Sequence, residues 1–184
     1  MAVKRHLRAL GVDDAPFRRG QGECTLVGVL VRAPSYVEGF VLGRVSVDGE
    51  DATGEIARMA NSRIGRVANV IMVNGVAVAG LNVVDLRGLS RLTGRPVISV
   101  SKNRPRRGLF LRALKKVPRW EERWRLIEDL ETVEIDGLYV HPVGLGIEDL
   151  RKVIENFQFR GKYPEPLRIA HLLARALVMG ESKG

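Results

Sequence analysis

Two adjacent carboxylates, Asp13 and Asp14, stand directly after a short apolar run near the N-terminus. Carboxylate oxygens are preferred ligands of hard divalent cations such as Mg²⁺. Metal-assisted cleavage of a phosphodiester uses two or three such groups, which converge on ions spaced about 4 Å apart. We therefore take Asp13 as a candidate metal ligand and catalytic residue. In the alternative interpretation, Asp13 only forms a local turn before Pro16.

The second carboxylate of the pair is expected to have a different role. Side chains alternate across a β-strand, so Asp14 points away from Asp13 if the strand continues that far. In that position Asp14 could cap the turn that follows.

Positive charge is in large excess, and it is concentrated in one segment. The net charge is +9 and the pI is about 10.3, values that favour contact with polyanions. Between Lys102 and Arg125 the sequence has ten Lys or Arg residues and only two acids, Glu121 and Glu122. We take this segment as a candidate nucleic-acid-binding surface, with Lys102, Arg104, Arg106 and Arg107 as the first candidates for phosphate contacts. GC-rich coding or thermal adaptation would also explain the excess of arginine.

Two helical patterns carry polar or aromatic side chains that could serve a site. Trp120 and Trp124 are four residues apart among arginines, so they could stack on bases, although packing as an apolar stripe is the favoured interpretation. Arg168, His171 and Arg175 form one polar stripe near the C-terminus. They could face a substrate, but hydrogen bonding to buried groups is favoured.

Length and composition fit one globular domain spanning residues 1–184, with a loose tail at about 180–184. No apolar stretch approaches the roughly 18 residues that span a bilayer, and the start MAVKRHLRAL lacks a signal-peptide core. Cys24 is the only cysteine, which fits a reducing compartment, so we expect a cytoplasmic protein with no membrane partner. The sequence contains no GxxxxGK[ST] or HExxH motif.

The order of predicted elements indicates the architecture. Apolar periodicity predicts strands at 7–12, 24–31, 40–47, 67–73 and 96–100, and helices after Asp51, at about 83–93, 108–117, 120–131, 147–156 and 165–179. Residues 132–145 are ambiguous because Pro142 and two glycines weaken a strand or hairpin there. Three successive strands and then alternating strands and helices predict an α/β fold. Its mixed central sheet has an antiparallel meander followed by parallel strands, with flanking helices, in a ribonuclease H-like order.

Three motifs resemble the endonuclease V family. The segment VIMVNGVAVAGLNVVDLRGLSRLTGRPVISVSKN, residues 70–103, is similar to a block in which a strand ends in Asp-Gly, a Gly-rich loop leads into a helix, and a second strand ends in a GVAK-like turn. PEPLRIAHLLARAL, residues 164–177, is similar to that family's PEPLRLA helix, and GVD at 11–13 to its first motif. APSYVEGFVLGRVSVDGEDAT, GLNVVDL and PEPLRIAH are closer still to the archaeal family DUF99, or UPF0215, a divergent branch of this fold. The chain is identified as a member of that family.

The resemblance implies further site residues. Asp51 lies near the position of the endonuclease V glutamate, although Asp48 and Glu50 compete for the role and each could instead shape a turn or cap a helix. Asn74 stands where that family has the aspartate of Asp-Gly; its amide oxygen can bind Mg²⁺ but brings no charge. Asp85 could compensate as a ligand, or it is simply an acid at a helix start. Lys102 matches the lysine of the GVAK turn, which implies a phosphate contact at a strand end, or it is a solvated loop lysine.

The resulting hypothesis is an endonuclease V-like protein that binds DNA or RNA and is a candidate Mg²⁺- or Mn²⁺-dependent phosphodiesterase. Asp13, Asp51 and Lys102 would be the catalytic residues, and Asp13, Asp51, Asn74 and Asp85 the metal ligands. The segment GVAVAGLN lacks the His and Arg of endonuclease V, and no PYIP wedge is present, which argues against cleavage directed at inosine. The alternative is a member of the fold that binds nucleic acid or a protein without catalysis.

Overall fold

The computed structural model describes residues 7–18 and 20–183. Within these residues seven strands form one sheet in the order β3-β2-β1-β4-β7-β9-β8, and two short strands form a separate hairpin. The sheet contains β1 (Arg8–Asp14), β2 (Glu23–Arg32), β3 (Tyr36–Ser46), β4 (Val70–Asn74), β7 (Val97–Ser101), β8 (Val133–Ile135) and β9 (Leu138–Val143). The hairpin consists of β5 (Ala77–Val78) and β6 (Asn82–Val83). The helices are α1 (Ala52–Asn61), α2 (Leu86–Thr93), α3 (Arg107–Leu114), α4 (Trp120–Arg125), α5 (Ile147–Phe157) and α6 (Glu165–Met179), and the 3-10 helix η1 is Gly65–Val67.

The sheet is mixed, as the sequence predicts. Strands β1, β2 and β3 form the antiparallel meander, and β1, β4 and β7 are parallel neighbours. The ambiguous segment is an antiparallel hairpin, in which β9 pairs with β7 and β8 with β9. Its turn has Asp136 and Gly137 at φ of 52° and 80°, a conformation that aspartate and glycine adopt more readily than most residues.

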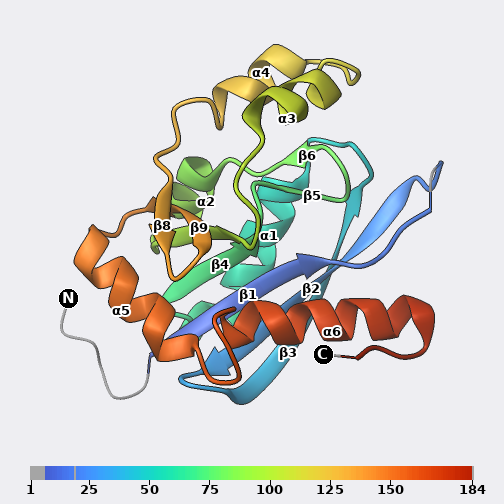
Figure 1. Ribbon diagram of the computed structural model, residues 1–184. Helices are drawn as coiled ribbons and strands as arrows, with labels where there is room; N and C mark the ends of the chain where they lie inside the picture. The colour runs from blue at the N-terminus through green and yellow to red at the C-terminus, as the bar shows by residue number, and fades with distance from the viewer. Residues whose placement is uncertain (1–6, 19, 184) are drawn as a thin grey trace.

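Helices cover both faces of the sheet (Figure 1). Helices α5 and α6 pack on one face, and α1 and α2 on the other, while α3 and α4 stand together beyond the β5–β6 hairpin. Residues alternate between the two resulting cores along each strand: Leu10 and Val12 of β1 belong to the core that contains α1, and Ala9 to the core that contains α6.

Helix α6 approaches β1 more closely than a side chain would permit. A Cβ built on Gly11 would lie 2.4 Å from the carbonyl carbon of Pro166, so only glycine fits at this position. This contact sets the first turn of α6 directly beside the end of β1. The histidine one turn further along the helix is thereby brought to the strand end.

Element boundaries differ from the predictions mainly around the hairpin and α4. The predicted helix at 83–93 begins at Leu86, because Val83 pairs in β6 and Asp85 caps α2. The predicted helix at 120–131 ends at Arg125 and continues as turns. In the described part of the chain, no helix is long and apolar enough to cross a membrane.

Candidate active site at the strand ends

Asp13 is the centre of a polar cluster at the carboxyl end of β1. This residue is only 1% exposed. Oδ1 accepts hydrogen bonds from the Asn74 Nδ2 atom at 2.9 Å and from the Asp14 backbone N–H at 2.9 Å. Oδ2 lies 2.8 Å from Nδ1 of His171 in α6. A carboxylate buried with several charge-assisted partners is held in one orientation, which suits a residue that must align other groups.

A second layer of contacts extends this cluster to β7. The Tyr163 hydroxyl donates to Oδ1 of Asn74 at 2.7 Å, which fixes the amide with its nitrogen toward Asp13. Burial, and the negative charge of Asp13, raise the pKa of Tyr163, so the phenol stays a neutral donor. The Lys102 Nζ atom lies 4.5 Å from the centre of the Tyr163 ring. Asp13, Asn74 and Lys102 thus gather at the carboxyl ends of three parallel strands, where open α/β sheets bind ligands.

Asp14 faces the opposite side of the sheet from Asp13, as expected from strand alternation. Its Oδ2 atom accepts the Ala79 N–H at 2.9 Å, so it ties the β5–β6 hairpin to β1. Burial, and the neighbouring charge of Asp13, raise the pKa of Asp14 to about 6.

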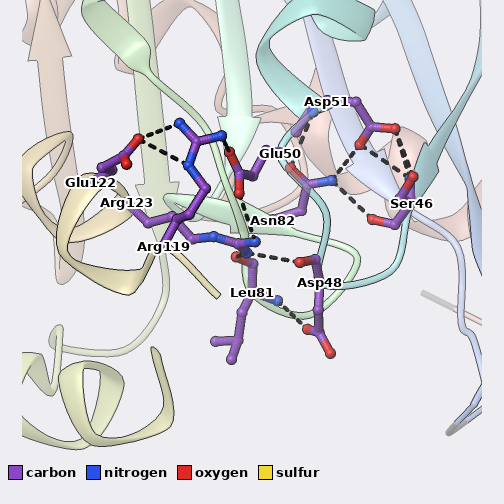
Figure 2. Close-up of polar contacts among 10 residues, drawn as sticks. Ser46, Asp48, Glu50, Asp51, Leu81, Asn82, Arg119, Glu122 and Arg123 are labelled. Carbon is purple, nitrogen blue, oxygen red and sulfur yellow. Dashed lines mark hydrogen bonds and ion pairs between the residues drawn. The ribbon is translucent and has the colours of Figure 1, made fainter. Parts of the chain in front are cut away.

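Asp51 belongs to a separate network on the loop between β3 and α1 (Figure 2). It accepts hydrogen bonds from the Ser46 N–H and hydroxyl, at 3.0 and 2.9 Å, and from Asn82 Nδ2 at 2.6 Å. Partial burial acts to raise the pKa of Asp51, but these donors outweigh it and lower the pKa below the usual range. Within the described residues Asp51 makes no hydrogen bond to Asp13 or Asn74.

The competing acids near Asp51 also have structural partners. Asp48 Oδ1 accepts the Leu81 N–H at 2.8 Å, and Glu50 pairs with Arg119 at 2.7 Å. The buried Arg123 guanidinium donates to the carbonyls of Asp48 and Leu81, at 2.8 and 2.9 Å, and thereby joins α4 to this loop (Figure 2). These contacts support the interpretation that the acids of this loop shape the turn.

Asp85 is the N-cap of α2. Its Oδ1 atom accepts the Gly88 N–H at 2.7 Å, and Oδ2 lies 3.6 Å from Arg91. These contacts agree with the interpretation that Asp85 is an acid at the start of a helix. The contacts of Asp85 in the described chain do not connect it with Asp13.

The basic segment is exposed as a phosphate-binding surface requires. Lys102, Arg104, Arg106 and Arg107 all lie on the surface between the end of β7 and the start of α3. Trp120 and Trp124 are partly buried against the core, as the packing interpretation predicted, and each also contacts a cation, Lys115 or Arg107.

Several residues of the cluster are not evident from the sequence. His171 stood out only as part of a polar helical stripe, in which Arg168 instead pairs with Glu165. No sequence pattern identifies Tyr163 as a site residue, because a single tyrosine before a helix has no characteristic spacing. Their roles depend on the close packing of α6 against β1.

The cluster supplies few ligands for metal ions. Among residues 7–18 and 20–183, no three His, Cys, Asp or Glu side chains are grouped so that they could hold one ion. Asn74 and His171 each lie within hydrogen-bond distance of Asp13, so a carboxylate, an amide and an imidazole are found together.

Comparison with known proteins gives a consistent result. Residues 5–178 match the family described as Endonuclease dU. A UPF0215 protein from Methanothermobacter thermautotrophicus is 39% identical over 189 residues, which cover 99% of this chain and 93% of the relative.

Solved structures extend the likeness to endonuclease V. A protein of unknown function from Archaeoglobus fulgidus has a TM-score of 0.87 at 31% identity, covering 94% of this chain and 98% of that one. Endonuclease V from Ciona intestinalis, in complex with a 24mer DNA containing an inosine followed by a ribo-adenosine, has a TM-score of 0.64 at 12% identity, covering 98% and 89%. The latter likeness shows the fold: the predicted endonuclease V-like architecture is confirmed.

Proposed function

This chain belongs to the Endonuclease dU family, and on that premise we propose that it is an endonuclease that cleaves DNA at or near deoxyuridine. The observation that carries the proposal is the setting of Asp13. This carboxylate is buried at a strand end and oriented by Asn74 and His171, which come from two other elements of the fold. Burying and orienting a carboxylate in this way costs folding free energy, which an acid left on the surface would not cost.

The Asp13–His171 pair can move a proton. A carboxylate accepts hydrogen bonds, so the Nδ1 atom of His171 carries the hydrogen, and Nε2 can act as an acceptor when it carries none. In the proposed reaction Nε2 takes a proton from water while the water oxygen bonds to phosphorus and the bond to the leaving oxygen breaks. The proton then passes to the leaving oxygen, which completes hydrolysis.

The cluster fits one divalent ion, Mg²⁺ or Mn²⁺, better than two. Asp13 keeps one unused acceptor position after its three hydrogen bonds. The Asn74 amide oxygen accepts from Tyr163 and would join the ion only if the amide turned its oxygen toward Asp13. Asp51 and Asp85, the other candidate ligands, would have to give up their present partners. A bound ion would supply Lewis-acid stabilisation of charge on the phosphodiester.

The basic residues at the end of β7 would hold the DNA backbone. Lys102 is near Tyr163 and hence near Asn74, so it is proposed to neutralise a phosphate oxygen in the transition state. Arg104, Arg106 and Arg107 would bind flanking phosphates.

Cleavage of single-stranded and duplex oligonucleotides with one deoxyuridine, in Mg²⁺, Mn²⁺ or EDTA, tests the proposal. We expect Asp13→Asn to lower the cleavage rate by roughly 100-fold or more, because His171 loses its orienting carboxylate. Asp129→Asn is the matched control, since Asp129 is an exposed acid paired with Arg87. Circular dichroism must show that both variants fold. Wild-type rates in folded Asp13→Asn would refute the assignment of Asp13.

A second candidate is a nucleic-acid-binding protein without catalysis. The scarcity of grouped His, Cys, Asp and Glu side chains in the described chain favours it. In that case the wild type binds the same oligonucleotides but cuts none of them. Thermal stability would then be unaffected by Mn²⁺, whereas an ion bound at Asp13 should raise the melting temperature of the wild type but not of Asp13→Asn.

A further inference from the structure

A cavity of about 280 Å³ lies beside the strand ends, on the face of the sheet opposite Asp13. Residues of β7, β9, α3 and the turns after α4 line it, with the loop that follows Asn74. Phe110, Trp124 and Ile127 are its main apolar and aromatic side chains, and Arg107 of the basic segment also borders it. Aromatic and arginine side chains of this kind stack on planar bases.

Ser99 gives this cavity an unsatisfied polar atom. Its side chain is 1% exposed, and its Oγ atom has no hydrogen-bond partner among the described residues. Buried hydroxyls are nearly always hydrogen-bonded, because an unpaired one loses its interaction with water. Since Ser99 lines the cavity, a polar atom of a bound molecule can supply the missing partner.

His141 gives the cavity an acceptor next to that hydroxyl. Ser99 and His141 are directly opposite each other in the antiparallel β7–β9 pair, so their side chains lie side by side. The Nδ1 atom of His141 is 2.8 Å from the carbonyl oxygen of Glu131, which can only accept, so Nδ1 carries the hydrogen. Burial lowers the pKa of His141, which keeps the ring neutral and leaves Nε2 as an acceptor.

We infer that this cavity receives one nucleobase turned out of the DNA strand, and that Ser99 Oγ and His141 Nε2 read its edge. The serine hydroxyl donates to a base carbonyl, and Nε2 accepts the adjacent ring N–H. Uracil presents this N–H beside a carbonyl. Cytosine presents an unprotonated ring nitrogen at the position of that N–H, which would oppose acceptor to acceptor at His141 Nε2, whereas the serine hydroxyl can rotate to suit either base. The pair therefore selects the deaminated base over its parent.

The position of the cavity agrees with this assignment, which rests on the proposed function. Gly75 lines the cavity and directly follows Asn74, the partner of Asp13. A strand that crosses the carboxyl ends of β1, β4 and β7 would pass Asp13 on one face and reach the cavity on the other. Thymine shares the uracil edge, but its stable pairing with adenine makes extrusion more costly than for a mismatched uracil.

Binding without cleavage tests the inference. Fluorescein-labelled single strands carrying one central deoxyuridine, deoxycytidine or tetrahydrofuran abasic analogue are titrated in EDTA. We expect the wild type to bind the deoxyuridine strand roughly tenfold more tightly than the other two, as loss of a buried hydrogen-bond partner implies. Ser99→Ala should reduce this preference to about twofold or less and leave affinity for the abasic strand unchanged. Ser35→Ala, in the turn between β2 and β3, is the control.

A second variant covers the case in which Ser99→Ala does not fold. Ala77 lines the cavity from the partly exposed β5, so Ala77→Phe should fill it and abolish the base preference. Equal affinity of the wild type for all three strands overturns the inference, as does a full preference in both variants. Base-selective binding without any cleavage would support the inference and refute the proposed function, whereas cleavage at deoxyuridine without base selectivity would do the reverse.

Discussion

Asp13 and Asp14 are the same residue type one position apart, yet their surroundings assign them different tasks. Asp13 points toward α6, where His171 and Asn74 satisfy its oxygens. Asp14 points toward the β5–β6 hairpin and accepts the Ala79 N–H, in the field of the Asp13 charge. The strand alternation that separates them is a property of any β-strand. The difference in their partners comes from the helix and hairpin that pack on each face.

The raised pKa of Asp14 predicts a pH-dependent gain in stability for Asp14→Asn. Its pKa rises from 3.8 to about 6 in the folded protein, so the native state binds this proton more tightly than the unfolded chain does. The ionised Asp14 therefore lowers the free energy of unfolding of the wild type above pH 6, and this loss is absent below about pH 4. We expect Asp14→Asn to raise the free energy of unfolding by about 1–3 kcal/mol at pH 8 and to have no such effect at pH 4.

Denaturant unfolding with EDTA at the two pH values measures this difference. Asn can still accept the Ala79 N–H, so the hydrogen bond is kept and only the charge is removed. Asp136→Asn, at an exposed position in the turn between β8 and β9, serves as the comparison. An equal effect of Asp14→Asn at pH 4 and pH 8 would contradict the assignment of the raised pKa.

At the scale of elements, a buried cation adds to the apolar packing that attaches α3 and α4 to the rest of the fold. Helix α4 has only six residues and no side-chain cap. Arg123 is 5% exposed and donates to the carbonyls of Asp48 and Leu81 (Figure 2). Because Trp124 and Phe110 belong to these helices, the attachment also sets the walls of the cavity.

Arg123→Met should therefore loosen α3 and α4. Two backbone carbonyls and Glu50 lose a donor, so we expect a loss of about 2–4 kcal/mol in the free energy of unfolding. Hydrogen exchange should rise selectively across residues 107–130. Arg125→Met, at an exposed position of the same helix, should change neither quantity appreciably. Unchanged exchange in Arg123→Met would show that the helices stay attached without this cation.

At the scale of the molecule, the fold places the buried Asp13 at the strand ends and the exposed basic residues on the surface beside it. The parallel strands bring Asp13, Asn74 and Lys102 to one edge, and the chain leaves that edge through the exposed arginines before α3. A polyanion attracted by the net charge of +9 would be directed to this edge rather than bound uniformly.

Affinity for undamaged DNA should accordingly fall steeply with salt. Replacing Arg112, Lys115 and Lys116 together by alanine should reduce the slope of log K against log salt by roughly 0.7–0.9 for each phosphate contact that is lost. The matched control removes Arg151, Lys152 and Arg160, three exposed charges on and after α5. Fluorescence anisotropy titrations between about 50 and 200 mM salt, where electrostatic affinity for DNA changes strongly, measure both slopes. Equal slopes for the two triple variants would show that the segment from 102 to 125 has no preferred role.

Much of the fold followed from local patterns. The strand predicted at 24–31 forms β2, and α6 has its predicted bounds. The β5–β6 hairpin was missed because two-residue strands have no measurable periodicity. Asp51 and Asp85 stand at strand or helix ends, where they form a turn and a cap, and no sequence pattern distinguishes such a role from that of a metal ligand.

The sequence by itself determined the mixed α/β fold, the strand that ends at Asp13 and the basic character of residues 102–125, because periodicity and charge are properties of short segments. Only the tertiary structure decided which groups meet Asp13. His171 lies 158 positions away from it in the chain and Asn74 lies 61 positions away, and the contact of Pro166 with Gly11 brings the histidine into reach. Likewise, Ser99 and His141 become neighbours only through the register of two strands. Distances between remote residues depend on packing, which no local pattern encodes.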